Sequence, residues 1–72
     1  MYFTLNPTLY YAANKESIEN YIVIESNGEA PYLMAYKRLK SIVESYIKLN
    51  SQCVDENKIN DYIVYICDQL TV

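Results

Sequence analysis

The sequence contains no histidine and no tryptophan, and it has only one glycine, two cysteines and two prolines. Histidine is the commonest acid–base group near neutral pH and the commonest metal ligand. Its absence excludes Ser-His-Asp and Cys-His catalytic sites and zinc sites that use histidine. One glycine is too few for the usual glycine-rich phosphate-binding loops. We therefore expect a protein that is not an enzyme and that holds no cofactor and no metal ion.

Long apolar runs and a basic leader are missing as well. No run approaches the roughly 20 apolar residues that a membrane-spanning helix needs. Residues 1–7 contain neither a basic stretch nor a long apolar stretch, so no signal peptide is expected. We therefore expect a cytoplasmic protein with no membrane segment. In that reducing compartment Cys53 and Cys67 are expected to be free thiols.

The side chains that are present are largely apolar and aromatic. Of the 72 residues 51% are hydrophobic and nine are tyrosine, and the formal net charge is −3. This composition is typical of a folded chain rather than a disordered one. A chain of this length buries roughly 60% of the surface that its unfolded form exposes. Residues 1–72 should therefore form one small domain with a thin core.

The second half of the chain has the clearest helical periodicity. Most apolar side chains of residues 31–49 fall in one arc of roughly 160° when placed at 100° per residue. Only Leu33 and Met34 lie outside that arc, and Pro31 suits the first turn. Residues 56–70 form a second helix, with Asp55 as a candidate N-cap. Its apolar stripe consists of Ile59, Ile63, Ile66, Cys67 and Leu70. The short segment between the two predicts an antiparallel pair.

The Asn27-Gly28 pair allows two interpretations. It could be the turn of a β-hairpin that follows a strand at 21–25, or the left-handed end of a helix over 15–26. The hairpin would place Pro31 where the ladder needs an N–H group, which proline lacks. Apolar residues spaced i, i+3 and i+4 occur here as in both other predicted helices. The pattern favours the helix.

The first residues of the chain are predicted to be extended. Asn6-Pro7-Thr8 is typical of a turn, so residues 2–13 are expected to form an extended segment or a short β-hairpin. The fold that we predict is mainly α, with three helices over 15–26, 31–49 and 56–70. The alternative is an α+β domain in which residues 21–25 form a strand.

Basic side chains concentrate in the middle helix. They are Lys37, Arg38, Lys40 and Lys48, against the single carboxylate of Glu44. One interpretation is a nucleic-acid-binding module that contacts phosphates with this basic face. The other is a solvated helix face with i, i+4 ion pairs to Glu44. The overall acidity opposes nucleic-acid binding, so we favour the solvated face.

The tyrosines are the most informative feature for function. Most fit inner or boundary positions of the predicted helices, namely Tyr21, Tyr32, Tyr36, Tyr46 and Tyr62. Tyr65 is predicted to lie on the outer face of the last helix, between Asp61 and Asp68. Tyr10 and Tyr11 are adjacent, so in a strand one of them must face outward. Tyrosine is enriched among the residues that dominate binding energy. Exposed tyrosines with acidic neighbours predict a protein-binding surface.

The functional hypothesis is a non-catalytic protein that binds another protein. Its acidity favours a partner with a basic surface, such as an enzyme that handles nucleic acid. The chain is small, and its composition, rich in Asn, Lys, Ile and Tyr, is typical of proteins encoded by AT-rich genomes. These two features suggest a virus-encoded inhibitor of a host nucleic-acid-handling or defence enzyme. A self-associating structural protein, such as a homodimer, is a further alternative because a thin core gains stability from dimerisation.

Overall fold

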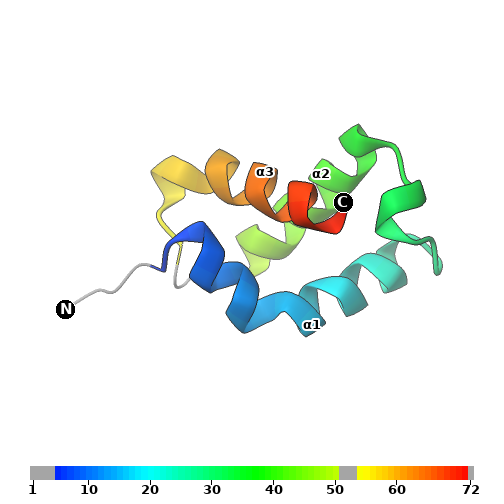
Figure 1. Ribbon diagram of the computed structural model, residues 1–72, viewed down its shortest axis with the longest axis horizontal. Coiled ribbons are helices and arrows are strands. Elements are labelled where there is room, and N and C mark those ends of the chain that lie inside the picture. The colour runs from blue at the N-terminus through cyan, green and yellow to red at the C-terminus, as the bar shows by residue number, and fades with distance from the viewer. Residues whose placement is uncertain (1–4, 51–53, 72) are drawn as a thin grey trace.

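The structure is a computed structural model that describes residues 5–50 and 54–71. Within these residues it contains three α-helices, α1 (Pro7–Glu25), α2 (Tyr36–Leu49) and α3 (Ile59–Leu70), and two single 3₁₀ turns, η1 (Pro31–Leu33) and η3 (Glu56–Lys58) (Figure 1). Residues 5–50 and 54–71 contain no β-strand. The predicted mainly α, three-helix fold is confirmed.

The first helix begins much earlier than the sequence pattern predicted. Asn6 is its N-cap, and the side chain of Asn6 accepts a hydrogen bond from the backbone N–H of Leu9 at 2.8 Å. Pro7 occupies the first turn, where its missing N–H costs nothing. The expected extended segment or hairpin over 2–13 is therefore wrong for residues 7–13, and residues 2–4 lie outside the described residues. Asn-Pro here is a helix start rather than a turn.

The end of α1 decides between the two interpretations of Asn27-Gly28. Both residues have positive φ, 60° for Asn27 and 91° for Gly28. The backbone N–H of Gly28 donates to the carbonyl of Val23 at 2.7 Å, which satisfies a carbonyl at the helix end. Residues 21–25 are helical, so the alternative of a strand there is wrong.

The predicted helix over 31–49 is broken near its start. Pro31–Leu33 forms only the 3₁₀ turn η1, and Met34 and Ala35 are extended, with ψ of 147° and 135°. Met34 is buried, with 7% of its surface exposed, whereas Leu33 is 68% exposed. The break turns Met34 into the core, which a continuous helix would not do because Met34 lies outside the apolar arc. The helix predicted over 56–70 begins with the turn η3, and Asp55 accepts from the N–H of Asn57 at 3.0 Å.

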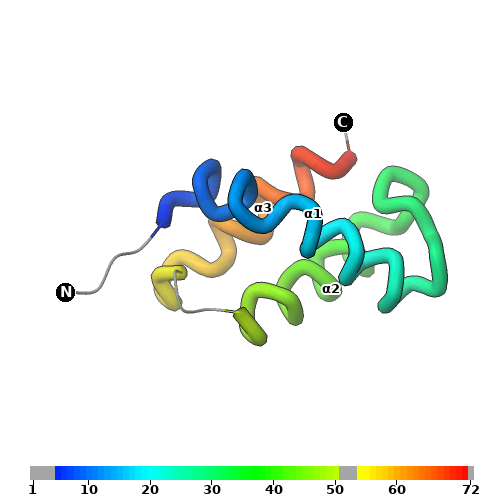
Figure 2. The backbone as a smooth tube through the Cα atoms, turned by 90° about the horizontal axis from the view of Figure 1, so that it is seen from below, coloured from blue at the N-terminus to red at the C-terminus, as the bar shows by residue number. Residues whose placement is uncertain are grey.

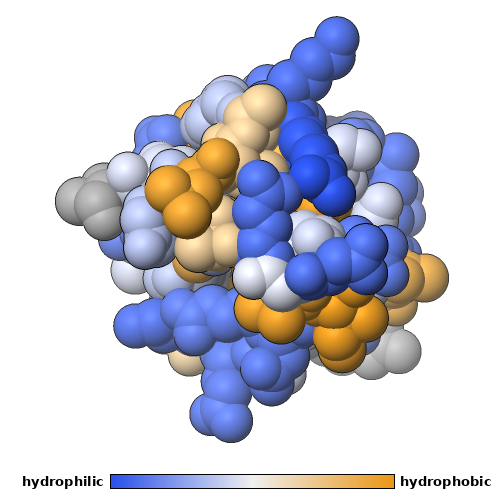
Figure 3. Space-filling model, turned by 90° about the vertical axis from the view of Figure 1, so that its right-hand side faces the viewer, coloured by the Kyte–Doolittle hydropathy of each residue, from blue (hydrophilic) through white to orange (hydrophobic). Residues whose placement is uncertain are grey.

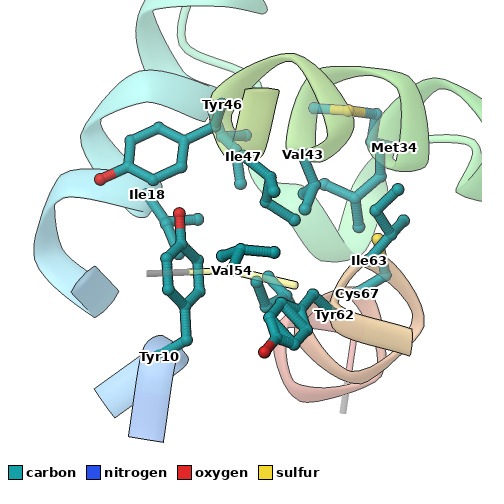
Figure 4. Close-up of a cluster of buried hydrophobic side chains, with 13 residues drawn as sticks. Tyr10, Ile18, Met34, Val43, Tyr46, Ile47, Val54, Tyr62, Ile63 and Cys67 are labelled. Carbon is teal, nitrogen blue, oxygen red and sulfur yellow. The ribbon is translucent and has the colours of Figure 1, made fainter. Parts of the chain in front are cut away.

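The three helices share one core. α2 and α3 run antiparallel, and α1 crosses both of them on one side (Figures 1 and 2). Buried side chains from all three helices meet between them, together with Met34 and Val54 (Figure 4). These core residues are Tyr10, Ile18, Ile22, Met34, Leu39, Val43, Tyr46, Ile47, Val54, Tyr62, Ile63, Ile66 and Cys67. In α2 and α3 the buried positions follow the predicted stripes.

The first helix differs from the other two because it is apolar on more than one side. Ile18 and Ile22 are fully buried, whereas Val23 and Ile24 are 45% and 71% exposed. Leu9, near the start of the helix, is 50% exposed. The core therefore uses only one of the apolar faces of α1.

Two isoleucines of α1 offer a matched test of this packing. We predict that Ile18→Ala lowers the free energy of unfolding by about 2–5 kcal/mol, because it leaves a cavity in the core. Ile24→Ala should change it by less than about 0.5 kcal/mol, because that side chain is exposed. Urea unfolding followed by circular dichroism measures both. Equal losses from the two substitutions would show that the orientation of α1 is wrong.

Candidate protein-binding surface

Tyr10 and Tyr11, the two adjacent tyrosines of the predicted binding surface, lie in different surroundings. Tyr10 is 2% exposed, and its ring stacks on that of Tyr62 with the ring centroids 5.7 Å apart. Its hydroxyl donates to the carbonyl of Asn50 at 3.4 Å. Tyr10 is a core residue and is not available to a partner. One residue of the pair was expected to face outward because a strand was assumed. On a helix, neighbouring side chains point only about 100° apart, so Tyr10 and Tyr11 need not face opposite sides.

Tyr65 is not the isolated surface tyrosine that the sequence predicted. It is partly buried, and its ring meets that of Tyr11 edge-on, with centroids 6.2 Å apart and an interplanar angle of 73°. Partial burial raises the pKa of Tyr11, and the charges of the Glu19 carboxylate and of the Tyr65 phenol group raise it further. The start of α1 covers this side of α3, which the sequence analysis missed because it assigned residues 7–13 to an extended segment.

The two aspartates that flank Tyr65 are exposed but lie in different surroundings. Asp68 accepts a hydrogen bond from the hydroxyl of Tyr36 at 3.4 Å. Partial burial and then this carboxylate raise the pKa of Tyr36. Asp61 instead lines an open cavity of about 360 Å³ at the opposite end of α3. Asp61 and Asp68 each lie about one helical turn from Tyr65 on α3, but Asp68 contacts Tyr36 whereas Asp61 faces the cavity.

The cavity beside Asp61 has a mixed lining. Its walls come from the start of α1 and from the segment that enters α3, namely Leu5, Asn6, Pro7, Asp55, Lys58, Asp61 and Tyr62. The hydroxyl of Tyr62 donates to the carbonyl of Leu5, and Asp55 is engaged as the cap of η3. Within the described part of the chain, no group of three or more cysteine or carboxylate side chains could hold a metal ion.

Most of the basic side chains of α2 are engaged within the chain. Arg38 forms an ion pair with Glu29 at 2.6 Å, and Lys48 forms one with Glu44 at 2.9 Å. The ammonium group of Lys40 lies over the ring of Tyr36, 5.7 Å from its centroid, rather than beside Glu44. Lys37 is exposed, and the described residues show no such partner for it. These contacts favour a solvated face with internal ion pairs over four side chains free to bind phosphates.

The exposed apolar side chains form the feature that sequence reasoning missed. Seven large apolar residues are exposed among the described residues, namely Leu9, Val23, Ile24, Tyr32, Leu33, Tyr36 and Leu49. All except Leu49 belong to α1, η1 or the first position of α2. Tyr32 and Tyr36, predicted to be inner or boundary residues, are 68% and 43% exposed because the helix breaks before Tyr36. Figure 3 shows hydrophobic residues between hydrophilic ones at the end of the molecule that carries the α1–α2 connection.

Comparison with protein-family models, with curated proteins and with solved structures found no match for this chain. In the part of the chain that the structure describes, none of the helices combines the length and the apolar character needed to cross a lipid bilayer.

The Tyr11–Tyr65 contact predicts a structural cost for removing either ring. We expect Tyr65→Ala to lower the free energy of unfolding by about 1–2 kcal/mol, since it removes a partly buried aromatic pair. Tyr32→Ala, at an exposed site, should change it by less than about 0.5 kcal/mol. In a Tyr11→Ala background the loss from Tyr65→Ala should shrink. Urea unfolding of the four proteins measures these values, and a Tyr65→Ala effect as small as that of Tyr32→Ala would contradict the contact.

The thiol of Cys67 generates a prediction about pH. Cys67 is fully buried, and burial, followed by the carboxylate of Asp68, raises its pKa from 9.0 to about 11, while Lys40 opposes the shift. The predicted inner position of Cys67 is confirmed, and Cys53 lies outside the described residues. In a Cys53→Ser variant, which leaves only this thiol, Cys67 should react with a thiol reagent only after unfolding.

The same shift makes stability depend on pH in a definite direction. The folded chain keeps the thiol protonated to a higher pH than the unfolded chain does, so the stabilisation is full below pH 9 and is lost between pH 9 and about 11. The unfolding free energy should fall less steeply over that range in Cys67→Ala than in the unmodified protein. Tyr11 and Tyr36 titrate in both proteins, so a difference in slope between the two comes from Cys67. Curves of unfolding free energy against pH that run parallel in the two proteins would contradict a buried neutral thiol.

Proposed function

We propose that this protein is non-catalytic and acts by binding another protein through its exposed apolar side chains. The observation that supports the proposal is their distribution, since six of the seven lie on α1, η1 and the first position of α2. Covering a side chain such as Leu or Ile gains about 1.5–3 kcal/mol relative to leaving it in water. A partner that covers several of them would gain enough to form a specific complex.

The charge of the chain supports a basic partner surface. Three exposed glutamates, Glu16, Glu19 and Glu25, lie on α1 with the single lysine Lys15. Complementary charge steers association and selects among partners. Enzymes that handle nucleic acid present basic surfaces to the phosphate backbone. The more specific form of the proposal is therefore that this protein inhibits such an enzyme. We place this interaction in the cytoplasm on the sequence pattern alone.

Two leucines of similar exposure make the proposal testable. Leu33 on η1 is 68% exposed and Leu49 at the end of α2 is 72% exposed. We expect tagged full-length protein to retain a partner protein from a lysate of its native cell. A variant with Leu9→Ser, Ile24→Ser and Leu33→Ser together should retain at least about tenfold less of it, while Leu49→Ser retains the same amount. Quantitative mass spectrometry measures the retained protein.

Three results would contradict the proposal. The first is equal retention by all variants, which would show that the exposed apolar residues are not the binding surface. The second is retention of nucleic acid alone, abolished by Lys37→Glu. The third is association of the chain only with its own copies, measured by analytical ultracentrifugation.

A further inference from the structure

The exposed side of α1 carries a row of residues that is apolar at both ends and polar at its centre. Residues 9, 13, 16, 20 and 23 follow one another at alternating spacings of four and three, and all five are exposed. They are Leu9, Ala13, Glu16, Asn20 and Val23, and we call this row the outer stripe. The same alternation places the a and d residues of a coiled coil on one line. A second helix packed against this side of α1 would therefore lie along the outer stripe.

The stripe has the position and length that such packing needs. In Figure 2 the molecule is seen from the side of α1, and no described segment lies over that helix. The distance from Leu9 to Val23 is about 21 Å at 1.5 Å per residue, or close to four helical turns. Ile24 adds a 71% exposed side chain beside Val23 at one end. Both ends of the stripe are apolar, and its centre is polar.

The polar centre decides which helix would fit. Glu16 lies midway between Leu9 and Val23. In a two-fold antiparallel pair of α1 helices with Leu9 against Val23, Glu16 would face its own copy. A parallel pair in register would place the same two carboxylates together. Like charges brought together without a partner charge are unfavourable, so a second copy of this chain is a poor occupant in either of these two registers.

We propose that the outer stripe of α1 binds a basic amphipathic helix of a partner protein, with a lysine or arginine opposite Glu16. Apolar residues of that helix would cover Leu9 at one end and Val23 with Ile24 at the other. The partner's cation would pair with Glu16, and Asn20 would supply a second polar contact that fixes the register, as a polar seam residue does in coiled coils. This inference rests on the proposed function and names its surface and the chemistry of the partner.

A pair of synthetic peptides tests the charge requirement directly. Both are amphipathic helices about three heptads long with leucine along the seam, and they differ in one central seam residue, lysine or glutamate. Fluorescence anisotropy of labelled peptide, titrated with the full-length protein near 0.15 M salt, measures affinity. We expect the lysine peptide to bind at least about tenfold more tightly than the glutamate peptide. Glu16→Lys should reverse that preference.

Two variants control for effects away from the stripe. Glu56→Lys makes the same change in net charge on η3, where the side chain is also exposed, and it should keep the preference for the lysine peptide. Leu9→Ser with Ile24→Ser should weaken binding of the lysine peptide at least about tenfold, whereas Leu49→Ser leaves it unchanged. Equal effects of Glu16→Lys and Glu56→Lys would overturn the inference, because binding would then follow net charge alone.

The outcomes also separate this inference from the proposed function. If neither peptide binds, while capture of a partner is lost only with Leu33→Ser, the surface lies on η1 and the outer stripe is not the site. The inference then fails and the proposed function stands. If the protein sediments as a dimer that Leu9→Ser with Ile24→Ser dissociates, the occupant is a second copy and the inference is overturned.

Discussion

The stacked pair Tyr10 and Tyr62 fixes how the first helix lies across the other two. Both side chains are 2% exposed. The hydroxyl of Tyr62 donates to the carbonyl of Leu5, just before α1, and the hydroxyl of Tyr10 donates to the carbonyl of Asn50, just after α2. The pair thus joins the start of α1, the end of α2 and the start of α3. Two large rings at this point bury more apolar area than any aliphatic pair could, which matters in a thin core.

The position of α1 sets what remains on the surface. Further along the helix, Asn14 accepts from the hydroxyl of Tyr46 at 3.2 Å and donates to the carbonyl of Tyr10 at 2.9 Å. These contacts orient the inner face of α1, whose phase then carries Ile18 and Ile22 inward and Val23 and Ile24 outward. The same placement of α1 brings the ring of Tyr11 into edge-on contact with the ring of Tyr65. The position of α1 therefore explains both why Tyr65 is partly buried and why the outer stripe is exposed.

The sequence predicted the parts of the fold in which periodicity and burial agree. In α3 the apolar stripe is single, and the buried residues include Ile63, Ile66 and Cys67 as expected. The pattern of α1 was misleading because apolar residues lie on opposite sides of the helix, which weakens the 3.6-residue period. Asn6-Pro7 could start either a turn or a helix, and only the packing of Tyr10 selects the helix. The predicted site depended on that choice, since Tyr65 is exposed only if α1 does not cover it.

The polar residues of the outer stripe also explain why α1 has a unique orientation. A helix with apolar residues on two sides could pack by either, and a small core can accept only one. Turning the outer stripe inward would bury Glu16 and Asn20 in the apolar core, and an unpaired buried charge is far more costly than an exposed leucine. Glu16 and Asn20 therefore select the inner face during folding. The same two residues would demand a cation and a polar contact from whatever covers the stripe, so the chemistry that makes α1 fold one way also narrows what can bind to it.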